Sequence, residues 1–364
     1  MHLAIITLHF GSNIGGILQS YALQSALEQM GHSVEVFDRQ HLPSPLWSWG
    51  SYAKDAIRAA IEGRMPLPRH LEHRVKGRFT LSHLHLAGRR DFGSLRPGDY
   101  DGYVVGSDQI WRPEYMDDRI EDAFLGFAEQ WGGVKRVAYA ASFGKDEWML
   151  TPSQTATCAR LAKLFDGVGV REDSAVGLCR EHLGVEARHV LDPTMLHDAD
   201  FYEALTRQGV KTRQGGGMFC YLLDLSRAKM SLARDVARRV GERKSVISDF
   251  TRLAGVEDHV RFPTVEQWLR CYADARCVLT DSFHGAAFSI IFGKPFAVIA
   301  NSHRGSTRME SLLRMFGLTD RLIDEGELAA PAHVAQLLQT PFDVSGRLDA
   351  LRHDARGFLT ASLG

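Results

Sequence analysis

The residues that could do chemistry in this chain begin with a polar stretch, Thr-Asp-Ser-Phe-His-Gly, at positions 280–285. The apolar run at 275–279 before it predicts a buried strand, and residues 286–295 predict a short helix that ends at a glycine and a proline. Ser282 and His284 therefore lie where a strand ends and a helix begins. In an open α/β sheet this edge binds ligands, and helix N–H groups there favour an anion.

Arginines after other predicted strands supply the positive charge that an anion site needs. Arg171 follows one strand, and its planar guanidinium suits a carboxylate or a phosphate. Arg304 and Arg308 follow the next strand after His284 and could line the same crevice. An internal ion pair, for example with Glu172, explains Arg171 equally well. A single histidine is also more often structural than functional.

Three further predicted strands end in small or polar residues. Asn13, Gly15 and Gly16 belong to a glycine-rich turn that would let backbone approach a ligand closely, although its spacing is neither a dinucleotide fingerprint nor a P-loop. Asp108 follows a buried strand and is a candidate acid or base, and Ser142 follows another. Helix capping or a plain turn accounts for these motifs equally well.

The elements that must position these residues alternate between short strands and helices, which predicts α/β domains with parallel, doubly wound sheets. A polar, glycine-rich stretch divides the chain into an N-terminal domain at 1–207 and a C-terminal domain at 218–340. We expect the site in the cleft between them. An irregular insertion at about 43–95 suits either a sugar-binding lid or a solvated excursion. Residues 341–364 predict a helix that packs back on the N-terminal domain.

Length and composition are those of a soluble globular protein, with 364 residues, 45% hydrophobic and 24% charged. The net charge of -1 gives no overall field that would attract nucleic acid. No apolar run approaches the about 20 residues of a membrane span, and no signal peptide is recognised. The five cysteines form no CxxC pair, which favours a reducing cytoplasm over a zinc site or a disulfide framework. We expect a cytoplasmic protein with at most peripheral contact at the inner face of the membrane.

The strand-end motifs, taken in order, resemble those of the polysaccharide pyruvyl transferases. The resemblance covers about residues 3–318 and is weak only across the predicted insertion and the tail. Six segments carry it: NIGGILQSYAL at 13–23, VGSDQIW at 105–111, YAASFG at 139–144, VREDS at 170–174, VLDPT at 190–194 and TDSFHG at 280–285.

This resemblance implies a GT-B-like fold with two Rossmann-like domains. It also implies an enzyme that moves the enolpyruvyl unit of phosphoenolpyruvate onto a sugar of a polysaccharide or its lipid-linked precursor. The product would be a pyruvate ketal, phosphate would be released, and neither a metal nor a cofactor would be required. Arg171 is implied as a donor-binding cation and His284 as the catalytic or phosphate-contacting histidine. Arg304 lies near a second cationic position, and Asp108 lies in a motif near the acceptor side.

Two other functions remain open on the sequence. A GT-B-type glycosyltransferase would need a nucleotide-sugar site in the second domain, for which the chain shows no distinct signature. A catalytically inactive, glycan-binding homologue would have no need of Arg171 and His284 together. The acceptor sugar, the division of acid and base roles between His284 and Asp108, and the oligomeric state also stay open.

Overall fold

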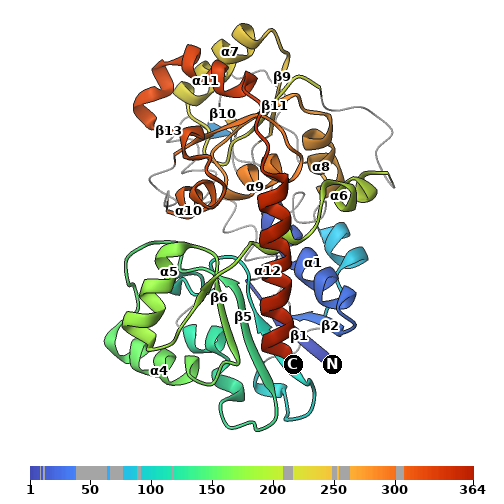
Figure 1. Ribbon diagram of the computed structural model, residues 1–364, viewed down its shortest axis with the longest axis vertical. Helices are drawn as coiled ribbons and strands as arrows, with labels where there is room; N and C mark the ends of the chain where they lie inside the picture. Colours follow the sequence, from blue (N-terminus) through green and yellow to red (C-terminus); the bar gives the residue numbers. More distant parts are fainter. Residues whose placement is uncertain are drawn as a thin grey trace.

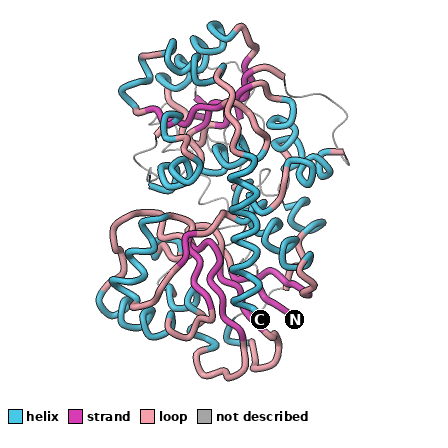
Figure 2. Tube along the Cα trace, viewed as in Figure 1, coloured by secondary structure: helices cyan, strands magenta, loops and turns pink. Residues whose placement is uncertain are grey.

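The structure is a computed structural model that describes residues 1–8, 10, 13–37, 64–65, 77–87, 92–116, 119–207, 216–247, 252–253, 263–300 and 307–364. Figure 1 shows two lobes stacked along the long axis of the molecule, and Figure 2 shows a sheet inside each lobe with helices around it. Two parallel α/β sheets were predicted from the alternation of elements, and the structure confirms them.

The sheet of the N-terminal lobe has six parallel strands in the order β2-β1-β4-β5-β6-β7. Its central strands are buried on both faces, as expected for a parallel sheet covered by helices on each side. Because the strands are parallel, their carboxyl ends meet at one edge. The strands are β1 His2–Ile6, β2 Ser33–Phe37, β4 Gly102–Val105, β5 Lys135–Ala141, β6 Gly167–Val170 and β7 Arg188–His189.

The sheet of the C-terminal lobe has five parallel strands in the order β13-β12-β11-β8-β9. They are β8 Met218–Tyr221, β9 Lys244–Ile247, β11 Cys277–Thr280, β12 Phe296–Ile299 and β13 Leu322–Ile323. A short antiparallel pair, β3 (Arg64–Met65) with β10 (Arg252–Leu253), connects the predicted insertion to the C-terminal half of the chain. Most of the predicted insertion at 43–95 lies outside the described residues.

Two helices begin earlier than the sequence predicts, and both changes affect the site. Helix α1 spans Ile14–Gln29, so Gly15 and Gly16 lie in its first turn rather than in a loop. Helix α9 spans Phe283–Ile291, so His284 is also a first-turn residue. The other α-helices are α4 Pro152–Ala162, α5 Asp173–Leu178, α6 Ala199–Thr206, α7 Arg227–Val240, α8 Val265–Asp274, α10 Thr307–Phe316, α11 Pro331–Gln339 and α12 Ser345–Leu363.

Short 3₁₀ turns connect several of these elements. They are η1 Phe92–Ser94, η2 Pro113–Tyr115, η3 Ile120–Phe124, η4 Gly126–Ala128, η6 Pro193–Leu196, η7 Thr319–Arg321 and η8 Glu325–Ala329, and a π-helical turn, η5 Cys179–Leu183, continues α5. Among the described helices, none combines the length and the apolar character needed to cross a membrane.

The last helix, α12, runs from the junction of the lobes down along β5 and β6 of the N-terminal lobe (Figure 1). Glycine in β6 makes this approach possible. A Cβ on Gly167 would lie 2.1 Å from Oγ of Ser362, and a Cβ on Gly169 would lie 3.0 Å from the Phe358 ring. Helix α12 therefore covers the first sheet with side chains that fill the space left by these glycines. The limits of the two domains remain predictions.

Candidate functional site

The first turns of α1 and α9, one from each lobe, are in contact at Gly15 and His284. Asn13 is the N-cap of α1 and accepts a hydrogen bond from the Gly15 N–H at 3.0 Å. Ser282 is the N-cap of α9 and accepts one from the Gly285 N–H at 3.3 Å. A Cβ on Gly15 would lie 2.1 Å from Nδ1 of His284, so the absent side chain allows the contact. Two positive helix ends therefore converge on the histidine.

Arg171 lies beside the contact between α1 and α9 and is almost fully buried. Its Nη1 donates to Oδ2 of Asp192 and its Nη2 donates to Oδ1 of Asp108, both at 3.3 Å. The guanidinium also stacks 4.6 Å above the ring centre of Phe283. Burial opposes the charge, but the two aspartates raise the pKa of Arg171 above its ordinary value. The internal ion pair is therefore present, with Asp108 and Asp192 as the hydrogen-bonded partners instead of Glu172, and contact of Arg171 with a donor stays a prediction.

Asp108 follows β4 in the left-handed backbone region, with φ of 61°. Its carbonyl oxygen accepts the Ser142 N–H at 3.1 Å, which fixes the loop after β4 to the loop after β5. Burial works to raise the pKa of Asp108, but Arg171, His284 and Arg308 outweigh it and hold the pKa below its ordinary value. Asp108 is therefore a carboxylate at neutral pH and holds no proton to donate.

Arg308 and His284 are two further predicted residues of the site. Burial and the neighbouring Arg171 guanidinium lower the pKa of Arg308 to about 10, so Arg308 still carries its charge at neutral pH. His284 is buried, and burial lowers its pKa below the ordinary value. Its Nε2 lies 3.9 Å from Oδ2 of Asp192 and has no hydrogen-bond partner among the described residues. Arg304 lies outside the described residues.

The two predicted serines use their hydroxyl groups within the protein. The Ser282 hydroxyl caps α9. The Ser142 hydroxyl donates to Oε1 of Glu172 at 2.8 Å and accepts the Gly144 N–H at 3.0 Å. Glu172 also accepts the N–H groups of Phe143 and Gly144, so this buried carboxylate shapes the loop after β5. A direct contact of either serine with a substrate stays a prediction.

The carboxylate of Asp281, the acidic residue of the 280–285 stretch, also binds groups within the protein. Its carboxylate accepts the N–H groups of Leu223 and Asp224 at 2.6 and 3.1 Å and pairs with Nζ of Lys229 at 2.7 Å. These bonds hold the loop between β8 and α7 against the end of β11. Of the two charged or ionisable residues of this stretch, His284 is thus the one that faces the N-terminal lobe.

Sequence reasoning did not select two residues that organise the site. Asp192 accepts the N–H and hydroxyl of Thr194 on Oδ1, which leaves Oδ2 for Arg171. Gln19 accepts the Ser107 N–H at 2.9 Å and donates to the Gly16 carbonyl at 3.0 Å. Signals existed for both: Asp192 follows a predicted strand, and Gln19 is a polar residue on an otherwise apolar helix face.

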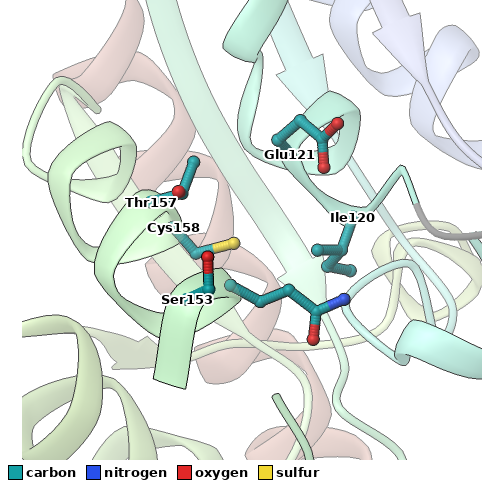
Figure 3. Close-up of a pocket in the computed structure, with 6 residues that line it drawn as sticks. Ile120, Glu121, Ser153, Thr157 and Cys158 are labelled. Carbon is teal, nitrogen blue, oxygen red and sulfur yellow. The ribbon is translucent and has the colours of Figure 1, made fainter. Parts of the chain in front are cut away.

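A surface hollow of about 290 Å³ lies elsewhere, between η3 and α4. Figure 3 shows Ser153, Thr157 and Cys158 on one side of it and Ile120 and Glu121 on the other. Burial raises the pKa of the Cys158 thiol to about 12, so the thiol is unreactive at neutral pH. None of the predicted site residues lines this hollow. Within the described part of the chain, no cluster of three or more His, Cys, Asp or Glu side chains could hold a metal ion.

The two parallel sheets, with polar strand ends facing one another across the lobes, define a two-domain α/β protein of the GT-B type. The chain is similar over 99% of its length to UDP-GlcNAc 2-epimerase from Methanocaldococcus jannaschii, with 100% of that chain covered, 13% identity and a TM-score of 0.50. It is also similar to the MnaA–UDP structure from S. aureus, with 10% identity, 99% and 97% of the two chains covered and a TM-score of 0.50. At these identities the likeness shows the fold alone.

The family is shown by the sequence. The family model described as polysaccharide pyruvyl transferase matches residues 13–303, and the chain belongs to that family. No curated protein matches the sequence of this chain. The family assignment predicted from the six strand-end segments is confirmed.

Proposed function

We propose that this protein transfers the pyruvate unit of phosphoenolpyruvate to a sugar of a polysaccharide or its lipid-linked precursor, and that the site at the α1–α9 contact performs the reaction. The observation that carries the proposal is the convergence of two helix N-termini, the buried Arg171 and the half-buried Arg308 on His284. Phosphoenolpyruvate bears a carboxylate and a phosphate, and both groups are bound well by helix N–H groups and guanidinium ions.

In this proposal the two arginines have different roles in donor binding. Both Nη atoms of Arg171 are engaged by Asp108 and Asp192, so Arg171 supplies positive potential more than a free guanidinium edge. Arg308 lies close enough to Arg171 for the two charges to repel, and this repulsion contributes to the lowered pKa of Arg308. A bound anion between them relieves that repulsion, which favours donor binding at this position.

The reaction has two additions at C2 of the donor. A proton from solvent is added to the C3 methylene carbon while a sugar hydroxyl oxygen attacks C2 and gives its own proton to His284. The C2–O bond to phosphate then breaks, the second hydroxyl attacks C2, and its proton leaves with the phosphate. One ketal and one phosphate result from one donor and two hydroxyl groups. Positive charge that develops at C2 is stabilised by the carboxylates of the site.

The pKa directions support one division of roles. The pKa of His284 lies below its ordinary value, so its imidazole is neutral and can accept a hydroxyl proton at neutral pH. The pKa of Asp108 is also lowered, so Asp108 is ionised and unsuited to protonate the methylene carbon. In this proposal His284 is the base, and Asp108 holds Arg171 and stabilises charge.

The test uses the purified protein with phosphoenolpyruvate and a panel of glycan and lipid-linked acceptors. We expect phosphate release together with a product whose mass corresponds to the pyruvate ketal. His284→Ala should abolish release while the thermal unfolding profile is kept, and Arg308→Ala should weaken donor binding measured by calorimetry.

Three results would contradict the proposal. They are no donor binding at all, normal phosphate release from His284→Ala, or turnover of a UDP-sugar instead of phosphoenolpyruvate. The last result would establish the glycosyltransferase alternative. Donor binding without turnover of any acceptor in the panel would favour the inactive homologue.

A further inference from the structure

The side chain of Asp192 lies at the base of the site, where the N-terminal lobe faces His284 of the C-terminal lobe. Asp192 is the N-cap of η6 in the N-terminal lobe, and its carboxylate is fully buried. Oδ1 is saturated by the N–H and hydroxyl of Thr194 at 3.0 and 2.7 Å. Oδ2 accepts hydrogen bonds from the Ser107 hydroxyl at 3.2 Å and from Nη1 of Arg171 at 3.3 Å. It also lies 3.9 Å from Nε2 of His284.

His284 offers this carboxylate a nitrogen that is otherwise unsatisfied. Its Nε2 is buried and has no hydrogen-bond partner among the described residues, and a buried unpaired polar atom calls for an explanation. Nδ1, on the other side of the ring, lies against Gly15 in the first turn of α1. The two ring nitrogens therefore have different surroundings: Nε2 faces an anion, and Nδ1 faces the helix end where a donor anion would bind.

Four charged groups face the imidazole from the surrounding elements. Asp192 and Asp108 favour its protonated form, and Arg171 and Arg308 disfavour it. Burial of the ring acts in the same direction as the two arginines, and together they outweigh the two carboxylates. Of the two carboxylates, Asp192 is the one within 4 Å of a ring nitrogen by direct measurement. It is therefore the group that can decide which nitrogen carries the proton of the neutral ring.

We propose that Asp192 is a positioning residue that keeps the proton of neutral His284 on Nε2 and so leaves Nδ1 as the base. The role of Nδ1 as the base depends on the pyruvyl transfer proposed above. A sugar hydroxyl gives its proton to Nδ1 as its oxygen bonds to C2 of the donor. The imidazolium that forms donates its Nε2–H towards Asp192. Hydrogen bonds of this kind are often long in the empty site and shorten when the substrates are bound.

The experiment measures the histidine itself and needs no turnover. Protein labelled with ¹⁵N-histidine contains 16 histidines, and the His284 signals are those lost in His284→Gln. Nitrogen chemical shifts show which ring nitrogen is protonated. We expect the Nε2–H form in the wild type, and in Asp192→Asn we expect a drop of at least about half a pH unit in the pKa of His284, because an attractive charge is lost.

Two further variants keep the test decisive. Asp173→Asn removes a carboxylate that pairs with Arg314 across the same two lobes, and it should leave the tautomer and the pKa of His284 unchanged. Ser107→Ala removes a competing donor from Oδ2 of Asp192 and should raise the pKa of His284, opposite in sign to Asp192→Asn. If Asp192→Asn does not fold, Ser107→Ala decides alone.

A proton on Nδ1 in the wild type, or an unchanged pKa in every variant that folds, would overturn the proposal. Its failure is distinguishable from that of the proposed function, since the signals of His284 are read without donor or acceptor. If phosphate release is also present, the acidic limb of its pH profile should move to lower pH in Asp192→Asn together with the measured pKa.

Discussion

Arg171 is the residue on which the charges of the site depend. It balances Asp108 and Asp192 in a buried environment, where breaking an ion pair from one side leaves carboxylates without compensation. We expect Arg171→Ala to lower the free energy of unfolding by about 3–5 kcal/mol, measured by urea denaturation. Loss of donor binding in this variant would therefore combine a missing cation with a disturbed site.

A matched control is Arg180→Ala, because Arg180 pairs with Glu186 on the surface of the same lobe. Exposed pairs contribute little to stability, so this variant should unfold at the wild-type urea concentration. If the two variants lost the same amount of stability, the buried network around Arg171 would not exist in solution.

Sequence reasoning identified the charged residues of the site better than their partners. His284, Asp108 and Arg171 were selected because each follows a buried strand, and strand ends of a parallel sheet meet at one edge. The structure brings these three together. The pairing of Arg171 with Asp192 was not predictable, since it depends on how the ends of β6 and β7 lie relative to each other. The capping role of Ser282 is a local property that position alone did not separate from ligand binding.

At the scale of elements, the packing of α12 on β6 depends on the size of Gly167. A Cβ at this position would lie 2.1 Å from Oγ and 2.8 Å from Cβ of Ser362. Valine favours strands, but here it would force the helix away from the sheet. We expect Gly167→Val to lower the free energy of unfolding by about 1–3 kcal/mol in urea denaturation.

Gly177 provides the opposite case in the neighbouring helix α5. Nothing lies within 4 Å of a Cβ at this position, and alanine is the better helix former by about 0.5–1 kcal/mol. Gly177→Ala should therefore stabilise the protein or leave it unchanged. Equal stability of Gly167→Val and the wild type would show that α12 does not pack on the sheet as described.

The boundaries of helices and strands were predictable where the apolar residues followed a single spacing, that of a helix or that of a strand. The apolar runs at 167–170 and 296–299 predict strands, and the strands Gly167–Val170 and Phe296–Ile299 have these limits. The apolar pattern predicts helices from 17 and from 286, three residues after α1 and α9 begin, because glycine, serine and histidine are more typical of loops. Their N-caps, Asn13 and Ser282, satisfy N–H groups in the first turn, which allows the helices to begin at weak helix formers. Strand β13, with two residues, was too short to give a pattern.

On the scale of the whole molecule, the site exists only where the lobes touch. Gly15 and His284 are 269 positions apart, and no period in the sequence relates them. Beside this contact, Asp173 pairs with Arg314, and its N–H donates to Oγ of Ser311 at 2.9 Å, so α5 and α10 also join the lobes. In the proposed donor site the residues come from both halves of the chain, so the approach of the lobes and the affinity for the donor should depend on each other.

Two neighbouring glycines allow this dependence to be measured. A Cβ on Gly15 would lie 2.1 Å from Nδ1 and 2.3 Å from Cγ of His284, whereas the nearest atom to a Cβ on Gly16 is Oδ2 of Asp108 at 3.7 Å. Gly15→Ala must displace the buried imidazole or separate the lobes. We expect it to lower the free energy of unfolding by about 1–3 kcal/mol and to abolish the rise in melting temperature caused by phosphoenolpyruvate.

Gly16→Ala places the same methyl group on the same helical turn and meets only ordinary contacts. Alanine is the better helix former, so the variant without donor should be as stable as the wild type or up to about 1 kcal/mol more stable. The difference between the two variants then isolates the contact between α1 and α9 from helix propensity. If Gly15→Ala gained stability as Gly16→Ala does, Gly15 and His284 would not touch in solution, and a donor site shared by the two lobes would have to be abandoned.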